Sequence, residues 1–96
     1  MLKIEIITSG SFRHLRLIGD LRNEELQELE RHLPSSSEEV ALGLGELKIV
    51  DLSAVRFLIG CEERGVRVLD CPFYVREWMN REKERGKSGQ GIERGG

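Results

Sequence analysis

The fold is decided by residues 40–69, which read VALGLGELKIVDLSAVRFLIGCEERGVRVL. Residues 39–44 are predicted to be a strand, and their continuous apolar run, residues 40–44, is typical of a strand that is covered on both faces. We interpret residues 45–50 as a turn, because Gly43 and Gly45 weaken a strand and indicate a close backbone approach. A helix from Asp51 to Gly65 follows from the helical spacing of the apolar residues Leu52, Val55, Leu58 and Ile59. Residues 66–69 then form a short strand.

Two strands and a helix are predicted on the N-terminal side of this unit. Residues 2–7 alternate with period two, and residues 12–18 alternate again after a turn, so the two segments form a hairpin. Residues 19–21 are expected to break the second strand. A helix over residues 22–33 follows, with Asp20 or Asn23 as its cap and Pro34 as its stop. Its apolar stripe consists of Leu26, Leu29 and Leu33.

A third helix is predicted on the C-terminal side, with Pro72 in its first turn. Glu77 and Arg81 lie one turn apart in it and are placed to pair. Its predicted buried face consists of Tyr74, Val75, Trp78 and Met79. From residue 83 onward the chain is rich in glycine and charge, so we expect a domain over residues 1–82 and a flexible tail over 83–96.

The order of these elements is strand, strand, helix, strand, helix, strand, helix. Strands that alternate with helices predict parallel pairing through right-handed crossovers, and the leading hairpin makes the sheet mixed. The fold class is therefore α/β, with a small mixed β-sheet of about four strands and about three helices.

Size and charge exclude several functions. The chain has 96 residues, with 15 Lys and Arg against 17 Asp and Glu, a net charge of −2 and a pI near 5.7. So short a chain leaves no room for a large enclosed cofactor site, and the near-balanced charge does not indicate a nucleic-acid partner. The charged N-terminus is not a signal peptide, and no apolar run is long enough for membrane insertion. We therefore expect a cytoplasmic protein without a cofactor.

Residues for metal binding or catalysis are sparse. Cys61, Cys71, His14 and His32 are too dispersed for a zinc site, and we expect two buried thiols. Cys71, next to Pro72, is the better candidate for thiol chemistry. No phosphate-binding loop follows any predicted strand. We expect no catalytic residue, no metal ligand and no enzymatic activity.

Several short motifs carry a resemblance to a known family. Residues 17–21, LIGDL, are similar to an L-x-G-x-L pattern at the end of a second strand. Residues 42–51 match a strand and turn that lead to an aspartate, and residues 65–69 and 71–78 match a last strand and its helix. Over residues 2–82 the sequence therefore resembles the STAS family, which includes bacterial anti-sigma-factor antagonists and the cytoplasmic ends of sulfate transporters. The resemblance implies a STAS-like fold.

This resemblance also implies a site. In the family, the second residue after the aspartate is a serine or threonine that a partner kinase phosphorylates, which places Ser53 at the phosphoacceptor position. The protein partner is expected to resemble an anti-sigma factor with serine kinase activity. The implied partner-binding surface consists of Glu46, Lys48, Asp51, Leu52, Ser53 and Arg56.

The run around Ser53 departs from the family's usual Asp-Ser-Ser-Gly. Leu52 replaces a small polar residue, Ala54 replaces a glycine, and Gly43 stands where many relatives carry an aspartate. Ser53 could therefore be an ordinary hydroxyl in a helix's first turn. A STAS scaffold that binds without phosphorylation, and a subunit of a membrane transport assembly, remain alternatives. The oligomeric state is left open.

Overall fold

The computed structural model describes residues 1–33 and 39–95, with side chains described as far as residue 85. Its elements are β1 (Leu2–Ser9), β2 (Phe12–Leu21), the 3₁₀ helix η1 (Asn23–Glu25), α1 (Leu26–Arg31), β3 (Glu39–Val50), α2 (Leu52–Glu63), β4 (Arg67–Leu69) and α3 (Phe73–Gly95). The sheet has the strand order β1-β2-β3-β4, with β1 and β2 antiparallel and the other two pairs parallel. The predicted α/β class, the mixed four-stranded sheet and the predicted order of elements are confirmed.

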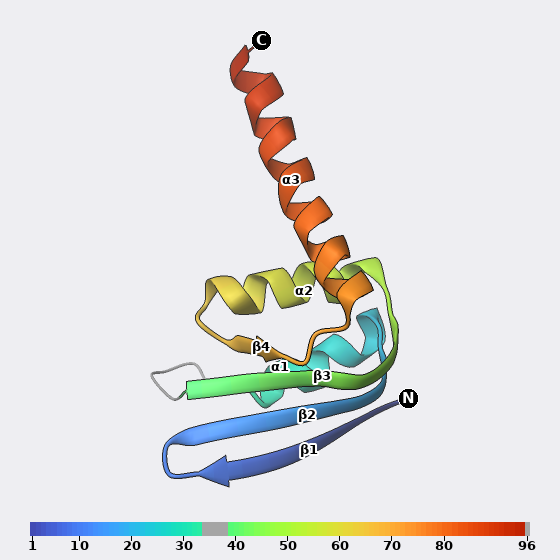
Figure 1. The fold of residues 1–96 in the computed structure, drawn as a ribbon, viewed down its shortest axis with the longest axis vertical. Coiled ribbons are helices and arrows are strands. Elements are labelled where there is room, and N and C mark those ends of the chain that lie inside the picture. The colour runs from blue at the N-terminus through green and yellow to red at the C-terminus, as the bar shows by residue number, and fades with distance from the viewer. Residues whose placement is uncertain (34–38, 96) are drawn as a thin grey trace.

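The core lies between the helices and one face of the sheet. Strand alternation directs Leu15 and Leu17 of β2 to this face, where both are fully buried. They pack in one cluster with β3, α1, α2 and α3 through Leu29, Leu42, Leu44, Val55, Leu58, Val75 and Met79. Figure 1 shows β2, β3 and β4 running the same way, so that the segments leading into α1, α2 and α3 begin at one edge of the sheet. We call this the carboxyl edge.

Strand β3 is twice as long as the sequence indicated. The predicted turn at residues 45–50 is wrong, because these residues continue β3 to Val50. The pairing with β2 shifts register after Gly43 and again after Leu47, so β3 takes one extra residue at each point. These two irregularities turn Leu47 and Val50 back into the core, three residues apart instead of two.

Two expectations near the end of β2 are also corrected. Residues 19–21 do not break β2 but stay in it, because they pair with residues 47–50 of β3. Gly19 lies at a register shift with a φ of +102°, which glycine adopts without steric cost. The predicted helix over 22–33 is shorter and divided into η1 and α1. Neither Asp20 nor Asn23 caps its start: the backbone N–H of Arg22 donates to Glu25 Oε1 at 3.0 Å. The stripe of Leu26, Leu29 and Leu33 does face the core.

Helix α3 differs from its prediction at both ends. Val75 and Met79 are fully buried, but Tyr74 is 50% exposed, so its predicted burial is wrong. The helical backbone continues past residue 82 to Gly95 and extends away from the sheet (Figure 1). The boundary at residue 82 is thus not an end of secondary structure, and the flexibility of residues 83–96 stays a prediction.

Ion pairs join α2 to α3, and the closest involves Glu62. Arg76 donates to both carboxylate oxygens of Glu62, at 3.0 and 2.8 Å, and Lys83 lies 3.6 Å from the same group. The hydrogen bonds from Arg76, more than its charge or that of Lys83, hold the pKa of Glu62 below the ordinary value of 4.5. Bidentate geometry makes this the strongest charged contact between the two helices.

We expect this pair to make the stability depend on pH. Because the pKa of Glu62 is lower in the folded state, its contribution is complete above about pH 4.5 and is lost as the pH falls through the folded-state pKa. Glu62→Gln should reduce the free energy of unfolding by about 1 kcal/mol near pH 7, since the pair is partly exposed and screened. Urea unfolding of both proteins near pH 7 and near pH 3 measures this. An equal difference at both pH values would contradict it.

Candidate functional site

The Asp51 side chain caps the starts of two helical segments, α2 and η1, at the carboxyl edge. Its Oδ1 accepts from the backbone N–H of Ala54 at 2.9 Å, which caps α2. Its Oδ2 accepts from the backbone N–H of Asn23, the first residue of η1, at 3.0 Å. Both carboxylate oxygens therefore hold backbone groups, and Asp51 positions the start of α2 against the end of β2. The helix start predicted at Asp51 is confirmed.

Ser53 is the second residue of α2 and is half-buried. No acceptor or donor for its hydroxyl occurs in the part of the chain that the structure describes. The backbone N–H groups of Leu52 and Ser53 have no partner within the helix, as expected for a first turn. A hydroxyl here thus stands beside free N–H groups and the positive end of the helix dipole.

Two apolar side chains near Ser53 in the sequence are exposed. Ile49, near the end of β3, is 43% exposed, and Leu52, the first residue of α2, is 37% exposed. Ile49 pairs with Asp20, whose neighbour Leu21 points into the core, so Ile49 lies on the face of the sheet away from the helices. We call Leu52 and Ser53 the edge patch. The sequence analysis did not predict that Ile49 is exposed, because it placed residue 49 in a turn. No pattern showed that Leu47, two residues earlier, is buried.

Only part of the predicted partner-binding set comes together. Asp51, Leu52 and Ser53 are consecutive at the start of α2, and Lys48 is exposed in β3. Glu46 instead lies 3.5 Å from Arg16, whose neighbours Leu15 and Leu17 point into the core. Strand alternation therefore puts the Arg16–Glu46 pair on the other face of the sheet, away from the helices.

Arg56 lies one turn after Ser53 on α2. Its Nε is 3.4 Å from Oε1 of Glu82 on α3, and the Arg56 side chain is 62% exposed. Residues at this spacing share one face of a helix, so the guanidinium is within reach of a charged group placed at Ser53.

Two aromatic side chains that the sequence analysis did not assign to a site also follow the carboxyl edge. Phe73 and Tyr74 open α3 after β4, and they are 77% and 50% exposed. Their exposure was missed because helical periodicity alone does not show which side of α3 meets α2. Large exposed apolar groups are the informative exception on a soluble surface.

Cysteine and histidine chemistry finds little support in the described residues. No group of three or more His, Cys, Asp or Glu side chains there could hold a metal ion. Cys61 is buried, as predicted, and desolvation raises its pKa to about 11. Cys71 is only partly buried, and desolvation raises its pKa as well, which keeps the thiol in its unreactive protonated form.

The structure explains why residue 43 is a glycine. A Cβ built there would lie 2.8 Å from Nε2 of His14, so a side chain at residue 43 would displace the imidazole. That Nε2 is buried without a hydrogen-bond partner. The close approach that Gly43 indicated is therefore the approach of the His14 ring.

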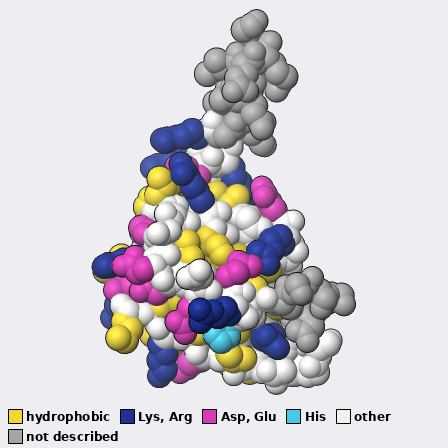
Figure 2. Space-filling view, turned by 180° about the vertical axis from the view of Figure 1, so that it is seen from behind, with side chains coloured by type: hydrophobic (Ala, Val, Ile, Leu, Met, Phe, Trp, Pro, Cys, Tyr) yellow, Lys and Arg dark blue, Asp and Glu magenta, His cyan; other side chains and the backbone are white. Residues whose placement is uncertain are grey.

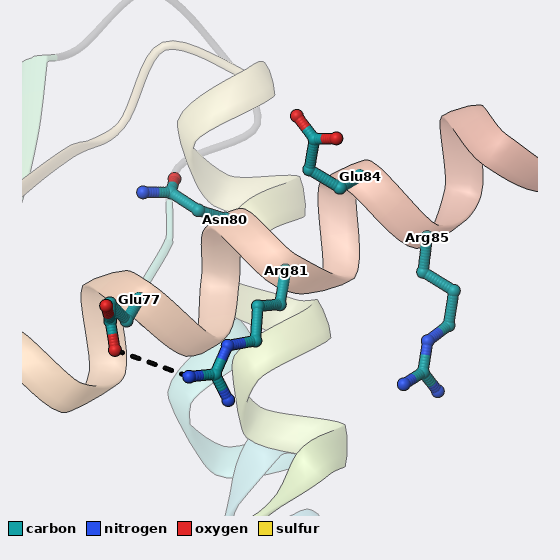
Figure 3. A pocket seen from close by; sticks show the side chains of 5 residues that line it. All are labelled: Glu77, Asn80, Arg81, Glu84 and Arg85. Atoms are coloured by element: carbon teal, nitrogen blue, oxygen red, sulfur yellow. Dashed lines mark hydrogen bonds and ion pairs between the residues drawn. The ribbon is translucent and has the colours of Figure 1, made fainter.

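A hollow that is open to solvent lies along α3. Glu77, Asn80, Arg81, Glu84 and Arg85 line it, and the predicted pair of Glu77 with Arg81 is present at 3.5 Å (Figure 3). Because all five residues come from one exposed helix, the hollow is open to solvent. Figure 2 shows Lys and Arg side chains interspersed with Asp and Glu among the coloured residues, with hydrophobic side chains between them in small groups.

Comparisons with known proteins support the fold. No family model matches the chain, and neither does any curated protein. The solved structure of Mglu is similar with a TM-score of 0.55 and 24% identity, over 71% of this chain and 19% of that chain. An uncharacterized protein from the DUF3478 family with a SpoIIAA-like fold, from Shewanella loihica PV-4, is similar with a TM-score of 0.43 and 18% identity, over 70% and 65%. The chain thus spans less than two thirds of either, and at this identity the likeness to Mglu concerns the fold alone.

Proposed function

We propose that this protein is a cytoplasmic, non-enzymatic regulatory module that binds a protein partner at the edge patch, in the manner of an anti-sigma-factor antagonist. The observation that carries the proposal is the position of a serine hydroxyl in the first turn of α2, next in sequence to the exposed apolar side chain of Leu52. The STAS resemblance of the sequence supports the choice of partner class. No helix in the described residues is long and apolar enough to cross a membrane.

Phosphorylation of Ser53 would act as the switch. A phosphate carries a charge of about −1.5 to −2 at pH 7 and would be stabilised by the free N–H groups and dipole of α2. It would also draw Arg56, one turn away, from its pair with Glu82. The same charge would lie beside the exposed Leu52, so a partner that covers Leu52 would have to desolvate the phosphate. Phosphorylation would therefore release the partner.

The test uses the partner kinase of the anti-sigma class with ATP. We expect mass spectrometry to locate one phosphate on Ser53, and Ser53→Ala to abolish its incorporation. In calorimetric titration with the partner, Ser53→Asp should weaken binding at least about tenfold, because the carboxylate must be desolvated.

A matched control is Ser11→Asp, in the exposed β1–β2 turn at the opposite edge of the sheet. It adds the same charge and should leave binding unchanged. Binding that Ser53→Asp leaves intact, without phosphate on Ser53, would exclude the switch. Loss of binding in Leu52→Asp would then identify a constitutive scaffold that uses the same patch. A role in a transport assembly stays a prediction from the resemblance.

A further inference from the structure

Strand β1 is a long edge with no neighbour on its outer side among the described residues. It has eight residues and lies outermost in the sheet (Figure 1). Its register with β2 is unbroken from Leu2↔Gly19 to Ser9↔Phe12, so no bulge disturbs it, and it contains no proline. The other edge strand, β4, has three residues. Soluble proteins normally blunt so long and regular an edge, because its free backbone groups can pair with another chain.

The turn determines which backbone groups of β1 face outward. Gly10 and Ser11 form a two-residue turn, with a φ of +62° at Gly10. In such a hairpin the flanking residues, Ser9 and Phe12, are a hydrogen-bonded pair, and hydrogen-bonded positions then recur at every second residue. The odd-numbered residues of β1 therefore bond to β2. The outward N–H and C=O groups belong to Leu2, Ile4, Ile6 and Thr8.

We propose that β1 pairs in antiparallel fashion with β1 of a second copy of this chain, with Ile4 opposite Ile4 on the twofold axis. In this register Leu2 lies opposite Ile6 of the second copy, and these even-numbered residues form the new hydrogen-bonded pairs. Lys3 lies opposite Glu5 of the second copy, at a non-hydrogen-bonded position, where side chains are closest. The two sheets join into one.

Charge selects this register over its neighbours. Sliding one strand by two residues in one direction puts Glu5 opposite Glu5, and in the other direction Lys3 opposite Lys3. Like charges directly opposite destabilise a strand pair, whereas opposite charges stabilise it. Lys3 can reach a second copy, because its side chain is 71% exposed. Its Nζ lies 3.6 Å from Oε2 of Glu5 in its own strand, an exposed contact that solvent screens.

A row of charged side chains crosses the sheet from β3 to β2 and ends at β1. On the face away from the helices, Arg16 lies 3.5 Å from Glu46 of β3 and 3.1 Å from Glu5 of β1. The signs alternate from strand to strand, negative in β3, positive in β2 and negative in β1. Lys3 of a second copy continues the alternation as the next strand.

The apolar side chains of the edge fit the same pairing. Ile6 is 48% exposed, although it belongs to the row of β1 that faces the core. Leu2 and Ile4, in the same row, are only partly buried against the core. Placing Leu2 opposite Ile6 and Ile4 opposite Ile4 joins the two rows and removes them from water.

The test is sedimentation equilibrium of the full chain and its charge variants. We expect the wild type to dimerise and Lys3→Glu and Glu5→Lys each to raise the dimer dissociation constant at least about tenfold, because each variant puts like charges opposite in both pairs. An equimolar mixture of the two variants should recover association as a heterodimer, since opposite charges then meet in both pairs. A monomeric wild type, or no recovery from two variants that keep the wild-type circular dichroism, would overturn the proposal.

A proline pair tests the same register through the backbone. Ile6→Pro removes an outward N–H that bonds to Leu2 of the second copy and spares the β1–β2 ladder. Thr8→Pro also removes an outward N–H, but that group lies beyond the paired segment. We expect the first variant to be monomeric and the second to dimerise like the wild type. Equal association of the two would contradict the proposed register.

Discussion

Leu47→Ala is expected to lower the free energy of unfolding by about 3 kcal/mol, a large fraction of the stability of a domain this small. The register shifts in β3 turn Leu47 into the core, where it is 7% exposed and packs in the cluster that includes Val50 and Ala54. Removing three carbon atoms from such a position loses transfer free energy and leaves a cavity. Urea unfolding followed by circular dichroism measures the change.

Ile49→Ala is the matched control. It truncates a side chain of the same size two residues away in the same strand, but Ile49 is 43% exposed. We expect a loss within about 1 kcal/mol, because most of the removed surface already contacts water. If the two variants lost equal stability, the assignment of Leu47 to the core and of Ile49 to the exposed surface would be wrong.

Asp51→Ala is expected to cost about 2 kcal/mol, because one side chain caps two helical segments. Each cap is worth about 1 kcal/mol, and both Ala54 N–H and Asn23 N–H would lose their acceptor. The amide exchange rates of these two groups should rise together, since the same carboxylate holds both. This readout separates the capping role from any general loss of packing.

Asp51→Asn distinguishes the two caps. An amide retains one oxygen acceptor, so only one of the two backbone N–H groups keeps its bond, and we expect about half the loss. Partner binding is the second measurement. If Asp51→Asn folds, and its loss of partner affinity is no larger than its loss of unfolding free energy explains, Asp51 positions Ser53 and does not contact the partner.

The local patterns determined most of the architecture. Period-two alternation in residues 2–7 and 12–18 predicted the hairpin, and Asp51 with the apolar stripe behind it predicted α2. Alternation of strands and helices then favoured parallel pairing of β2, β3 and β4, because a helix between two strands can carry the chain back to the start of the sheet. These features depend on neighbouring residues only, so a single sequence shows them.

Only the tertiary structure decided which side chains of β3 are buried. Two glycines suggested that residues 45–50 were a turn, but pairing with β2 on one side keeps them in the strand and shifts its register twice. That shift buries Leu47, which alternation from Leu44 would place on the other face of the sheet. Tyr74 was misjudged for a related reason, because the face of α3 that is buried is set by how the helix crosses α2.

The candidate site divides in the same way. The sequence by itself determined Ser53 and its place in the first turn of a helix, through the aspartate two residues before it. The tertiary structure decided its surroundings: it moved Glu46 to the far face with Arg16, and engaged both oxygens of Asp51 in capping. Helix starts are encoded within a few residues, whereas a surface is made where separate strands end, and that depends on their register.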